Sequence, residues 1–151
     1  TALDAAATFL EADLRAGRCL VLIGPTGVGK SYAAAALMRA VRHGTFWYFP
    51  GLCGAWLDAE RRQDALTASR QTRLAVFDDF GVEYARAGGL VEAFLDEVVW
   101  HREGNRLATI ITTNLTIEQL KARVSDRIVD RLRGEWGRVI ECPGASLRGH
   151  Q

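Results

Sequence analysis

Short apolar runs alternate along the chain with longer segments in which apolar residues recur at helical spacing. The runs have the length and composition of buried strands; they are CLVLI (19–23), TFWYF (45–49), LAVF (74–77), LATIITT (107–113) and GRVIEC (137–142). Strands that alternate with helices in this way predict an α/β fold, with a parallel sheet covered by helices on both faces. Ligands of such sheets bind at the carboxyl ends of the strands, so the residues after each run are the first candidates for chemistry.

Glycines, prolines and polar clusters set the expected boundaries between these elements. Residues 31–43 are rich in strong helix formers, and we expect Gly44 to end that helix. Pro50 is expected to stop the aromatic strand. Residues 51–66 are expected to form one helix, followed by a polar connector over residues 67–73.

Three further helices are expected in the second half of the chain. An apolar stripe predicts one helix over residues 90–104. Thr116 and Gln119 have the spacing of a capping box, which starts a short helix. A second short helix is expected to begin after Ser125 and to end at Gly134.

Composition narrows the class of protein. A chain of 151 residues with 48% hydrophobic residues fits one compact domain, so residues 1–151 are treated as a single domain. The net charge of +1 gives no overall field toward nucleic acid, so a nucleic-acid contact would need a local patch. The three cysteines are widely spaced, which favours reduced intracellular thiols over a disulfide or zinc frame. The sequence shows neither an apolar run of membrane-spanning length nor a signal-peptide pattern, so a cytoplasmic location is expected.

The stretch GPTGVGKS, residues 24–31, matches the phosphate-binding pattern G-x-x-x-x-G-K-[ST] between a predicted strand and a predicted helix. Lys30 is one of only two lysines in a chain with seventeen arginines. An ammonium group suits the β- and γ-phosphates of ATP as a compact point charge, and a planar guanidinium fits less well. Glycines let backbone N–H groups surround an anion, and the Ser31 hydroxyl can bind Mg²⁺. The candidate nucleotide-binding residues are Gly24, Pro25, Thr26, Gly27, Val28, Gly29, Lys30, Ser31 and Tyr32. The alternative is an ordinary strand-to-helix turn with an exposed Lys30.

Polar residues also follow two other predicted strands. Asp78 is the expected ligand on the Mg²⁺ side, through water, and Asp79 is expected to orient and deprotonate the attacking water. Asn114 could align the same water with the γ-phosphate. The alternative is that these are capping or turn residues, but the order of glycine loop, acid pair and amide favours hydrolysis of ATP to ADP.

Together these motifs resemble the AAA+ ATPases of the helicase-loader clade, the DnaC/DnaI type, and the related IstB-like transposition ATPases. GPTGVGKS looks like Walker A, LAVFDDFG like Walker B and IITTNL like sensor 1, which implies a sensor role for Asn114. SDRIVDRLRG is similar to the arginine-finger helix, with Arg131 as the best match and Arg127 as the second choice, and GASLRG looks like sensor 2, with Arg148. The alternative is that these arginines only form an ordinary solvated helix face. The resemblance implies a P-loop NTPase of the AAA+ class, an αβα sandwich with a five-stranded parallel sheet and little or no separate helical lid.

The resemblance also implies a function. It points to an ATP-dependent homo-oligomer that acts on single-stranded DNA in replication initiation and loads a replicative helicase. Loaders carry an N-terminal helicase-binding segment, which is expected to be absent or removed here. Clade members also carry a DNA-facing helix before Walker B, and residues 51–66 could hold it, with Trp56, Arg61 and Arg62 as contacts. Tyr84 and Arg86 form a second aromatic and basic pair. An ordinary helix and loop explain both sets equally well.

Three other functions use the same core and stay open. An IstB-like transposition helper would coat duplex DNA. A small-molecule kinase or nucleotide switch would need a lid and an acceptor pocket, which the acid pair and the late arginines disfavour. A partner-binding module would use ATP only to assemble.

Overall fold

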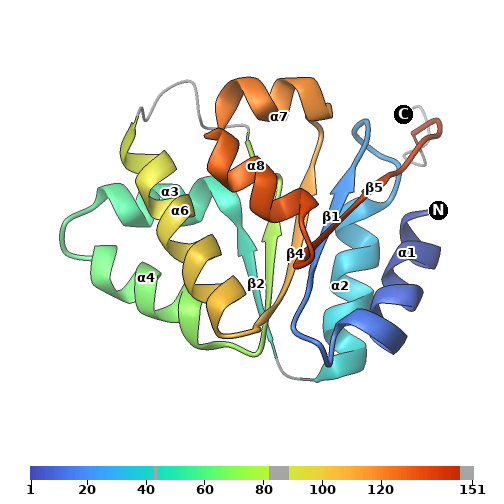
Figure 1. The fold of residues 1–151 in the computed structure, drawn as a ribbon, viewed down its shortest axis with the longest axis horizontal. Coiled ribbons are helices and arrows are strands. Elements are labelled where there is room, and N and C mark those ends of the chain that lie inside the picture. Colours follow the sequence, from blue (N-terminus) through green and yellow to red (C-terminus); the bar gives the residue numbers. More distant parts are fainter. Residues whose placement is uncertain (43, 82–88, 147–151) are drawn as a thin grey trace.

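A computed structural model describes residues 1–42, 44–81 and 89–146. Within these residues five strands form one parallel sheet in the order β2-β3-β4-β1-β5 (Figure 1). The strands are β1 (Cys19–Ile23), β2 (Thr45–Tyr48), β3 (Leu74–Asp78), β4 (Ala108–Thr113) and β5 (Gly137–Glu141). The helices are α1 (Ala2–Thr8), followed by a π-helical segment η1 (Phe9–Asp13), α2 (Lys30–Val41), α3 (Phe49–Leu57), α4 (Arg62–Gln71), α6 (Gly89–Gly104), α7 (Ile117–Arg123) and α8 (Asp126–Arg133). The predicted α/β fold is confirmed. None of the helices in this described part of the chain is long and apolar enough to cross a membrane.

Helices cover both faces of the sheet (Figure 1). α1 and α2 pack on one face, and α3, α4, α6 and α8 pack on the other. Side chains of β1 divide between the two layers, since Val21 joins the core under α3 and α6 whereas Leu20 and Leu22 join the core under α1 and α2. Every residue of β1, β3 and β4 is buried. Polar side chains can therefore reach solvent from these strands only where the strands end.

Two expected boundaries are wrong, and each error has a local cause. α2 ends before Gly44, because Arg42 takes the left-handed conformation with a φ of 61° and its N–H bonds the Met38 carbonyl at 3.2 Å. Pro50 was expected to end the aromatic strand as a strand breaker, but β2 already ends at Tyr48. Pro50 lies in the first turn of α3, where its missing N–H costs no helical hydrogen bond, and α3 follows β2 directly.

The single helix expected over residues 51–66 is two helices, and most of the connector expected over residues 67–73 is helical. Asp58 turns the chain between α3 and α4, and its carboxylate accepts a hydrogen bond from the Glu60 N–H at 3.0 Å, as is typical of aspartate in turns. α4 continues through the expected connector because its inner face, with Ser69 at 0% exposure, packs into the protein. Tertiary packing here overrides a polar local composition.

The caps of the two short helices are confirmed. In front of α7, the Thr116 hydroxyl accepts from the Gln119 N–H at 3.2 Å, and the Gln119 side chain accepts from the Thr116 N–H at 2.9 Å. The Ser125 hydroxyl caps α8, which ends at Gly134. The helix expected over residues 90–104 is α6.

A fully buried arginine joins α6 to the ends of two other elements. Arg102 is 0% exposed. Its guanidinium donates hydrogen bonds to the Ser69 and Thr72 carbonyls at 2.9 and 3.1 Å. It also donates to the Ala108 carbonyl at 2.6 Å and to the Thr109 hydroxyl at 2.8 Å. Burial lowers the pKa of Arg102 to about 10, which still leaves the group charged at neutral pH. This charge therefore ties the end of α4 to the start of β4.

We expect Arg102→Ala to lower the free energy of unfolding by at least about 1–3 kcal/mol, the cost of leaving one buried polar group unsatisfied, because buried carbonyls lose their donor. Urea unfolding followed by circular dichroism measures the change. Arg73→Ala removes an exposed arginine nearby and should change stability by less than about 0.5 kcal/mol. Equal losses in the two variants would contradict the role assigned to Arg102.

Candidate functional site

The loop between β1 and α2 carries the glycine pattern. Gly27 and Gly29 have φ angles of 89° and 91°, in the region that favours glycine. A Cβ atom on Gly27 would stand 2.2 Å from the Ser146 hydroxyl, so the close approach of that segment also requires glycine. The Gly29 carbonyl accepts a hydrogen bond from the Ala33 N–H at 2.9 Å, which begins α2. The loop thus ends in a helix N-terminus, which favours a bound anion.

Lys30 is held inside this loop. It is 6% exposed, and its ammonium donates hydrogen bonds to the Gly24 and Pro25 carbonyls at 2.7 and 2.8 Å. Burial lowers the pKa of Lys30, and the Asp79 and Asp78 carboxylates act in the opposite direction. The alternative of an exposed lysine on an ordinary turn does not fit this burial.

The acid pair, Asp78 and Asp79, lies where β3 ends, and both residues form hydrogen bonds with β4. Asp78 is 8% exposed, and the Thr112 hydroxyl donates to its Oδ1 at 2.6 Å. Asp79 has a φ of 57°, a left-handed conformation that is uncommon outside glycine. Its N–H donates to the same Thr112 hydroxyl at 3.1 Å. The Phe80 N–H donates to the Thr112 carbonyl at 2.8 Å, so the turn after β3 is fastened to β4.

The end of β4 connects the acid pair with the glycine loop. The Thr113 hydroxyl donates to the Phe80 carbonyl at 2.7 Å, and the Thr113 carbonyl accepts from the Gly24 N–H at 3.2 Å. Asn114 follows directly and is exposed. This arrangement follows from the strand order, because β4 lies between β3 and β1.

A cavity of about 870 Å³ opens among these elements, a size typical of small-molecule sites. Of the predicted site residues, it brings together residues 26–32, Asp79 and Asn114, whereas Gly24, Pro25 and Asp78 do not line it. Lys30 is the only basic side chain and Asp79 the only acidic one among the described residues that line it. The cavity therefore sets one cation and one carboxylate into the same space.

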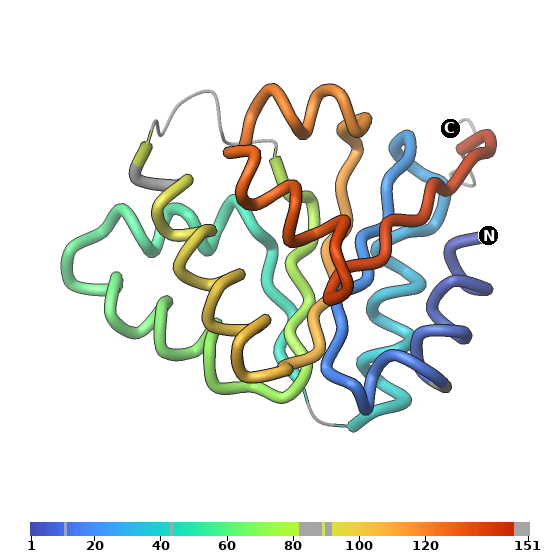
Figure 2. Tube along the Cα trace, in the orientation of Figure 1, coloured from blue at the N-terminus to red at the C-terminus, as the bar shows by residue number. Residues whose placement is uncertain are grey.

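Three parts of the cavity wall were not predicted. They are residues 1–3, Tyr48 at the end of β2, and residues 142–146 after β5. Figure 2 shows the start of α1 and the segment after β5 side by side near the glycine loop. Tyr48 pairs in register with Asp78, so the rule that ligands bind at strand ends could have found it. The same rule covers residues 142–146, which follow β5 and overlap the stretch compared to sensor 2. Residues 1–3 carry no such signal, because their approach to the glycine loop depends on the tertiary fold.

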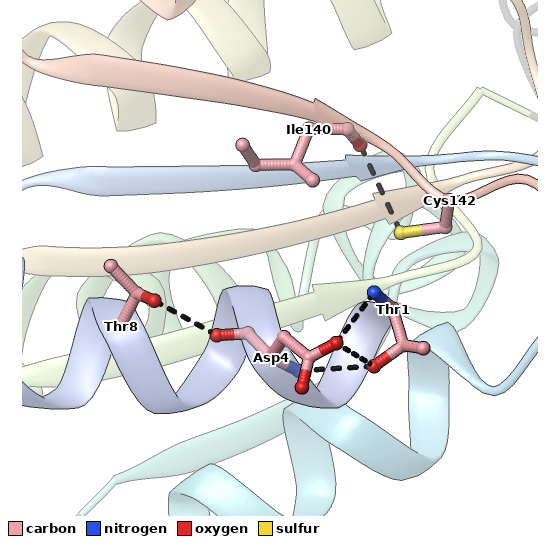
Figure 3. Close-up of polar contacts among 5 residues, drawn as sticks. All are labelled: Thr1, Asp4, Thr8, Ile140 and Cys142. Carbon is pink, nitrogen blue, oxygen red and sulfur yellow. Dashed lines mark hydrogen bonds and ion pairs between the residues drawn. The ribbon is translucent and has the colours of Figure 1, made fainter.

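Polar contacts hold both of these segments (Figure 3). The Thr1 hydroxyl accepts from the Asp4 N–H at 3.2 Å and caps α1. On the other side, the Cys142 N–H donates to the Ile23 carbonyl at 2.6 Å, and its Sγ lies 3.9 Å from the Ile140 carbonyl. Burial raises the pKa of the Cys142 thiol. Cys142 thus contributes a neutral thiol to the cavity wall.

The two candidate finger arginines lie on α8 and do not line the cavity. Arg131 forms a half-buried ion pair with Glu103 of α6, and Arg127 pairs with Asp96 at 3.2 Å. Arg148, the candidate sensor 2 residue, lies outside the described residues. The described part of the chain therefore brings no arginine to its own cavity.

The candidate DNA contacts differ in their availability. The Trp56 ring stacks on Phe94 with ring centroids 4.8 Å apart, and the Arg62 guanidinium lies 5.3 Å from the centre of the Trp56 ring. Arg62 also donates to the Trp56 carbonyl at 2.9 Å. These two side chains therefore hold the turn between α3 and α4 together, while Arg61 is exposed. Tyr84 and Arg86 lie outside the described residues.

A family model for IstB-like ATP-binding proteins matches residues 7–151. The chain belongs to this family. The resemblance predicted from the sequence is thereby confirmed. No curated protein matches the IstB-like chain.

Solved structures show the same fold. They include DnaI, with 22% identity and a TM-score of 0.79 over 97% of this chain and 82% of that one. The DnaC helicase loader has 22% identity and a TM-score of 0.77 over 91% of this chain and 86% of that one. A replication initiator DnaA bound to AMPPCP and single-stranded DNA has 17% identity and a TM-score of 0.76 over 94% of this chain and 45% of that one. These likenesses confirm the P-loop AAA+ fold of this IstB-like protein.

We expect Lys30→Ala to weaken ATP binding by about 10–100-fold, because charge-assisted hydrogen bonds contribute about 1.5–3 kcal/mol. Titration with a fluorescent ATP analogue measures the affinity. The other lysine of the chain provides the matched control, since Lys121→Ala removes an exposed ammonium on α7 and should bind like the wild type. Unchanged affinity in Lys30→Ala would remove the glycine loop from the site.

Proposed function

We propose that this chain binds ATP with Mg²⁺ and hydrolyses it. The observation that carries the proposal is the shared cavity, whose wall contains both the buried Lys30 and the Asp79 side chain. Hydrolysis of a triphosphate needs positive charge on the phosphates and a group that positions the attacking water. These two residues supply the two requirements in one space.

The residues of the site divide this work. The backbone N–H groups of the glycine loop and the Lys30 ammonium hold the β- and γ-phosphates. Asp79 accepts the proton of the attacking water, in the role of a general base. Asn114, which also lines the cavity, orients that water through its amide. Tyr32, also in the wall, is placed to contact the nucleotide.

The available donors fit Mg²⁺. Ser31 supplies a hydroxyl from the first turn of α2 in the cavity wall, and the Asp78 carboxylate at the end of β3, which does not line the cavity, would reach the ion through water. Mg²⁺ prefers oxygen ligands and keeps part of its water shell, so one or two protein groups with the phosphates suffice. When bound, the ion neutralises charge that develops on the phosphate oxygens.

We expect Asp79→Asn to keep ATP binding and to lower turnover by about 10²–10⁴-fold, the usual contribution of a general base. Phosphate release at saturating ATP measures turnover, and nucleotide titration checks that binding survives. The amide matches the carboxylate in size, so thermal unfolding should be nearly unchanged. Normal turnover would mean that the base lies elsewhere, and Asp78→Asn would be the next variant to measure.

The cellular role that we propose is a helicase-loader type of activity in DNA replication. The AAA+ fold shared with DnaC and DnaI supports it. In this role the chain works as a homo-oligomer on single-stranded DNA and has a replicative helicase as its partner. Arg61 remains the accessible candidate for a DNA contact between α3 and α4.

The IstB family match favours a second candidate, a transposition helper on duplex DNA. ATP turnover measured with matched single-stranded and duplex oligonucleotides separates the two functions. Stimulation by single strands favours the loader, and stimulation by duplex favours the helper. ATP binding without turnover in either case favours a module that uses ATP only to assemble.

The oligomer has a specific chemical purpose in this proposal. Arg131 lies outside the cavity of its own chain, and ATPases of the helicase-loader type present this helix to a neighbour. Arg131 of one subunit would then reach the nucleotide of the next. An arginine supplied in this way can raise turnover by about 10³–10⁵-fold.

We expect Arg131→Ala to bind ATP but to hydrolyse it poorly, and wild-type turnover per subunit to rise with protein concentration. Mixing tests the arrangement, because Arg131→Ala subunits keep an intact cavity and Asp79→Asn subunits keep an intact Arg131. Assembled together, the two should regain part of the activity that each lacks alone. A mixture as inactive as its components would refute the role in a neighbouring site and make Arg127 the residue to test.

Two control variants separate this role from a structural one. Glu103→Gln breaks the ion pair of Arg131 but keeps the guanidinium, so it should retain turnover if the arginine acts on nucleotide. Arg133→Ala removes an exposed arginine from the same helix and should retain turnover as well. Equal loss in Arg131→Ala and Glu103→Gln would show that only the ion pair matters.

A further inference from the structure

We propose that Thr112 is the positioning residue of the site, and that its single hydroxyl sets the geometry of both acidic residues. The inference rests on the proposed ATPase function. The Thr112 hydroxyl donates to the Asp78 carboxylate at 2.6 Å and accepts from the Asp79 N–H at 3.1 Å. One oxygen atom on β4 therefore contacts the side chain of the first aspartate and the backbone of the second.

The position of Thr112 in a buried strand does not explain why its side chain carries a hydroxyl. The residue is 0% exposed and lies in the fully buried strand β4, between Ile111 and Thr113. Valine has nearly the same shape and would be buried at lower cost, because a buried hydroxyl must find hydrogen-bond partners. A threonine at this position is explained by the partners that its hydroxyl has.

The other two buried threonines of β4 show what is particular about Thr112. The Thr113 hydroxyl donates to the Phe80 carbonyl and accepts from the Leu115 N–H, so its partners are backbone groups. The Thr109 hydroxyl accepts from Arg102 at 2.8 Å, below the site at the other end of the strand. Of the three, Thr112 is the one whose hydroxyl donates to a carboxylate of the acid pair.

The two hydrogen bonds have different consequences. Donation to Oδ1 of Asp78 fixes the rotation of that carboxylate, and with it the position of its second oxygen, Oδ2. Acceptance from the Asp79 N–H supports a left-handed backbone, φ 57°, that costs energy for a residue with a side chain and persists only where the surroundings hold it. Asp79 lines the cavity in this conformation.

The hydroxyl also couples the two aspartates. Its one proton is committed to Asp78, so its oxygen is polarised and accepts more strongly from the Asp79 N–H. Rotation of the Asp78 carboxylate and the backbone position of Asp79 are thereby linked through one atom. Groups that orient a metal ligand in this way typically change metal affinity or activity by about 10–100-fold when they are removed.

The test compares Thr112→Val, which keeps the shape and loses the hydroxyl, with Thr112→Ser, which keeps the hydroxyl and loses a methyl group. In the valine variant the Asp79 amide should exchange with solvent roughly tenfold faster, because it loses its acceptor, as followed by NMR without nucleotide. The gain in ATP affinity on adding Mg²⁺, and turnover at saturating ATP, should each fall by about 10–100-fold. The ATP affinity of Thr112→Val without Mg²⁺ should stay within about twofold of the wild type. In Thr112→Ser, amide exchange, the gain in affinity on adding Mg²⁺ and turnover should all match the wild type.

The outcomes distinguish failure of the positioning role of Thr112 from failure of the proposed ATPase function. A Mg²⁺ gain that is unchanged in Thr112→Val, or an equal loss in Thr112→Ser, refutes the positioning role while the ATPase function stands. A wild-type protein that shows no Mg²⁺ gain and no turnover refutes the proposed function and with it the inference. If Thr112→Val does not fold, Thr112→Ala and Thr112→Ser form a second pair that differs by the hydroxyl alone, and the same comparisons apply.

Discussion

Helices bury the central strands of the sheet on both faces, and this burial decides where polar side chains can lie. β1, β3 and β4 expose no side chain along their length, because helices pack on both sides of the sheet. A polar side chain can therefore contact solvent or a ligand only where a strand ends and the chain turns. Parallel strands end at the same edge, so the glycine loop after β1, the acid pair after β3 and Asn114 after β4 meet there without any further requirement. The cavity is a consequence of strand order as much as of its residues.

Much of this could be read from the sequence, for a physical reason. Double burial makes a strand a continuous apolar run, and a strand that must end in a polar turn is followed by glycine or aspartate. The strands β1, β3 and β4 were found in this way, and so was the glycine loop before Lys30. The partly exposed edge strands β2 and β5 were found from their aromatic and β-branched residues. The caps at Thr116 and Ser125 were equally visible, because a cap is a contact between residues three positions apart.

What could not be predicted depends on contacts between distant segments. The break at Asp58 and the length of α4 are decided by packing against the rest of the protein. The part of the cavity wall formed by residues 1–3 requires the start of α1 to reach the glycine loop. Glu103 is separated by 28 positions from Arg131, and no spacing rule connects them. Thr112 was visible as a strand residue, but its contact with Asp78 appears only when β3 and β4 are paired.

Both cations of the proposed mechanism already have partners within their own chain. The Lys30 ammonium is bonded to two loop carbonyls, and Arg131 is paired with Glu103. ATP binding and assembly are then exchanges of partners, and only the difference between old and new interactions appears as affinity. For Lys30 the exchange favours the nucleotide, because burial has already removed the ammonium from water and lowered its pKa, and phosphate oxygens offer full negative charge in place of carbonyl dipoles. For Arg131 the exchange is between a carboxylate and a phosphate, two partners of like charge. In the proposed assembly, a neighbouring subunit with bound triphosphate would offer Arg131 more negative charge than the single carboxylate of Glu103 does.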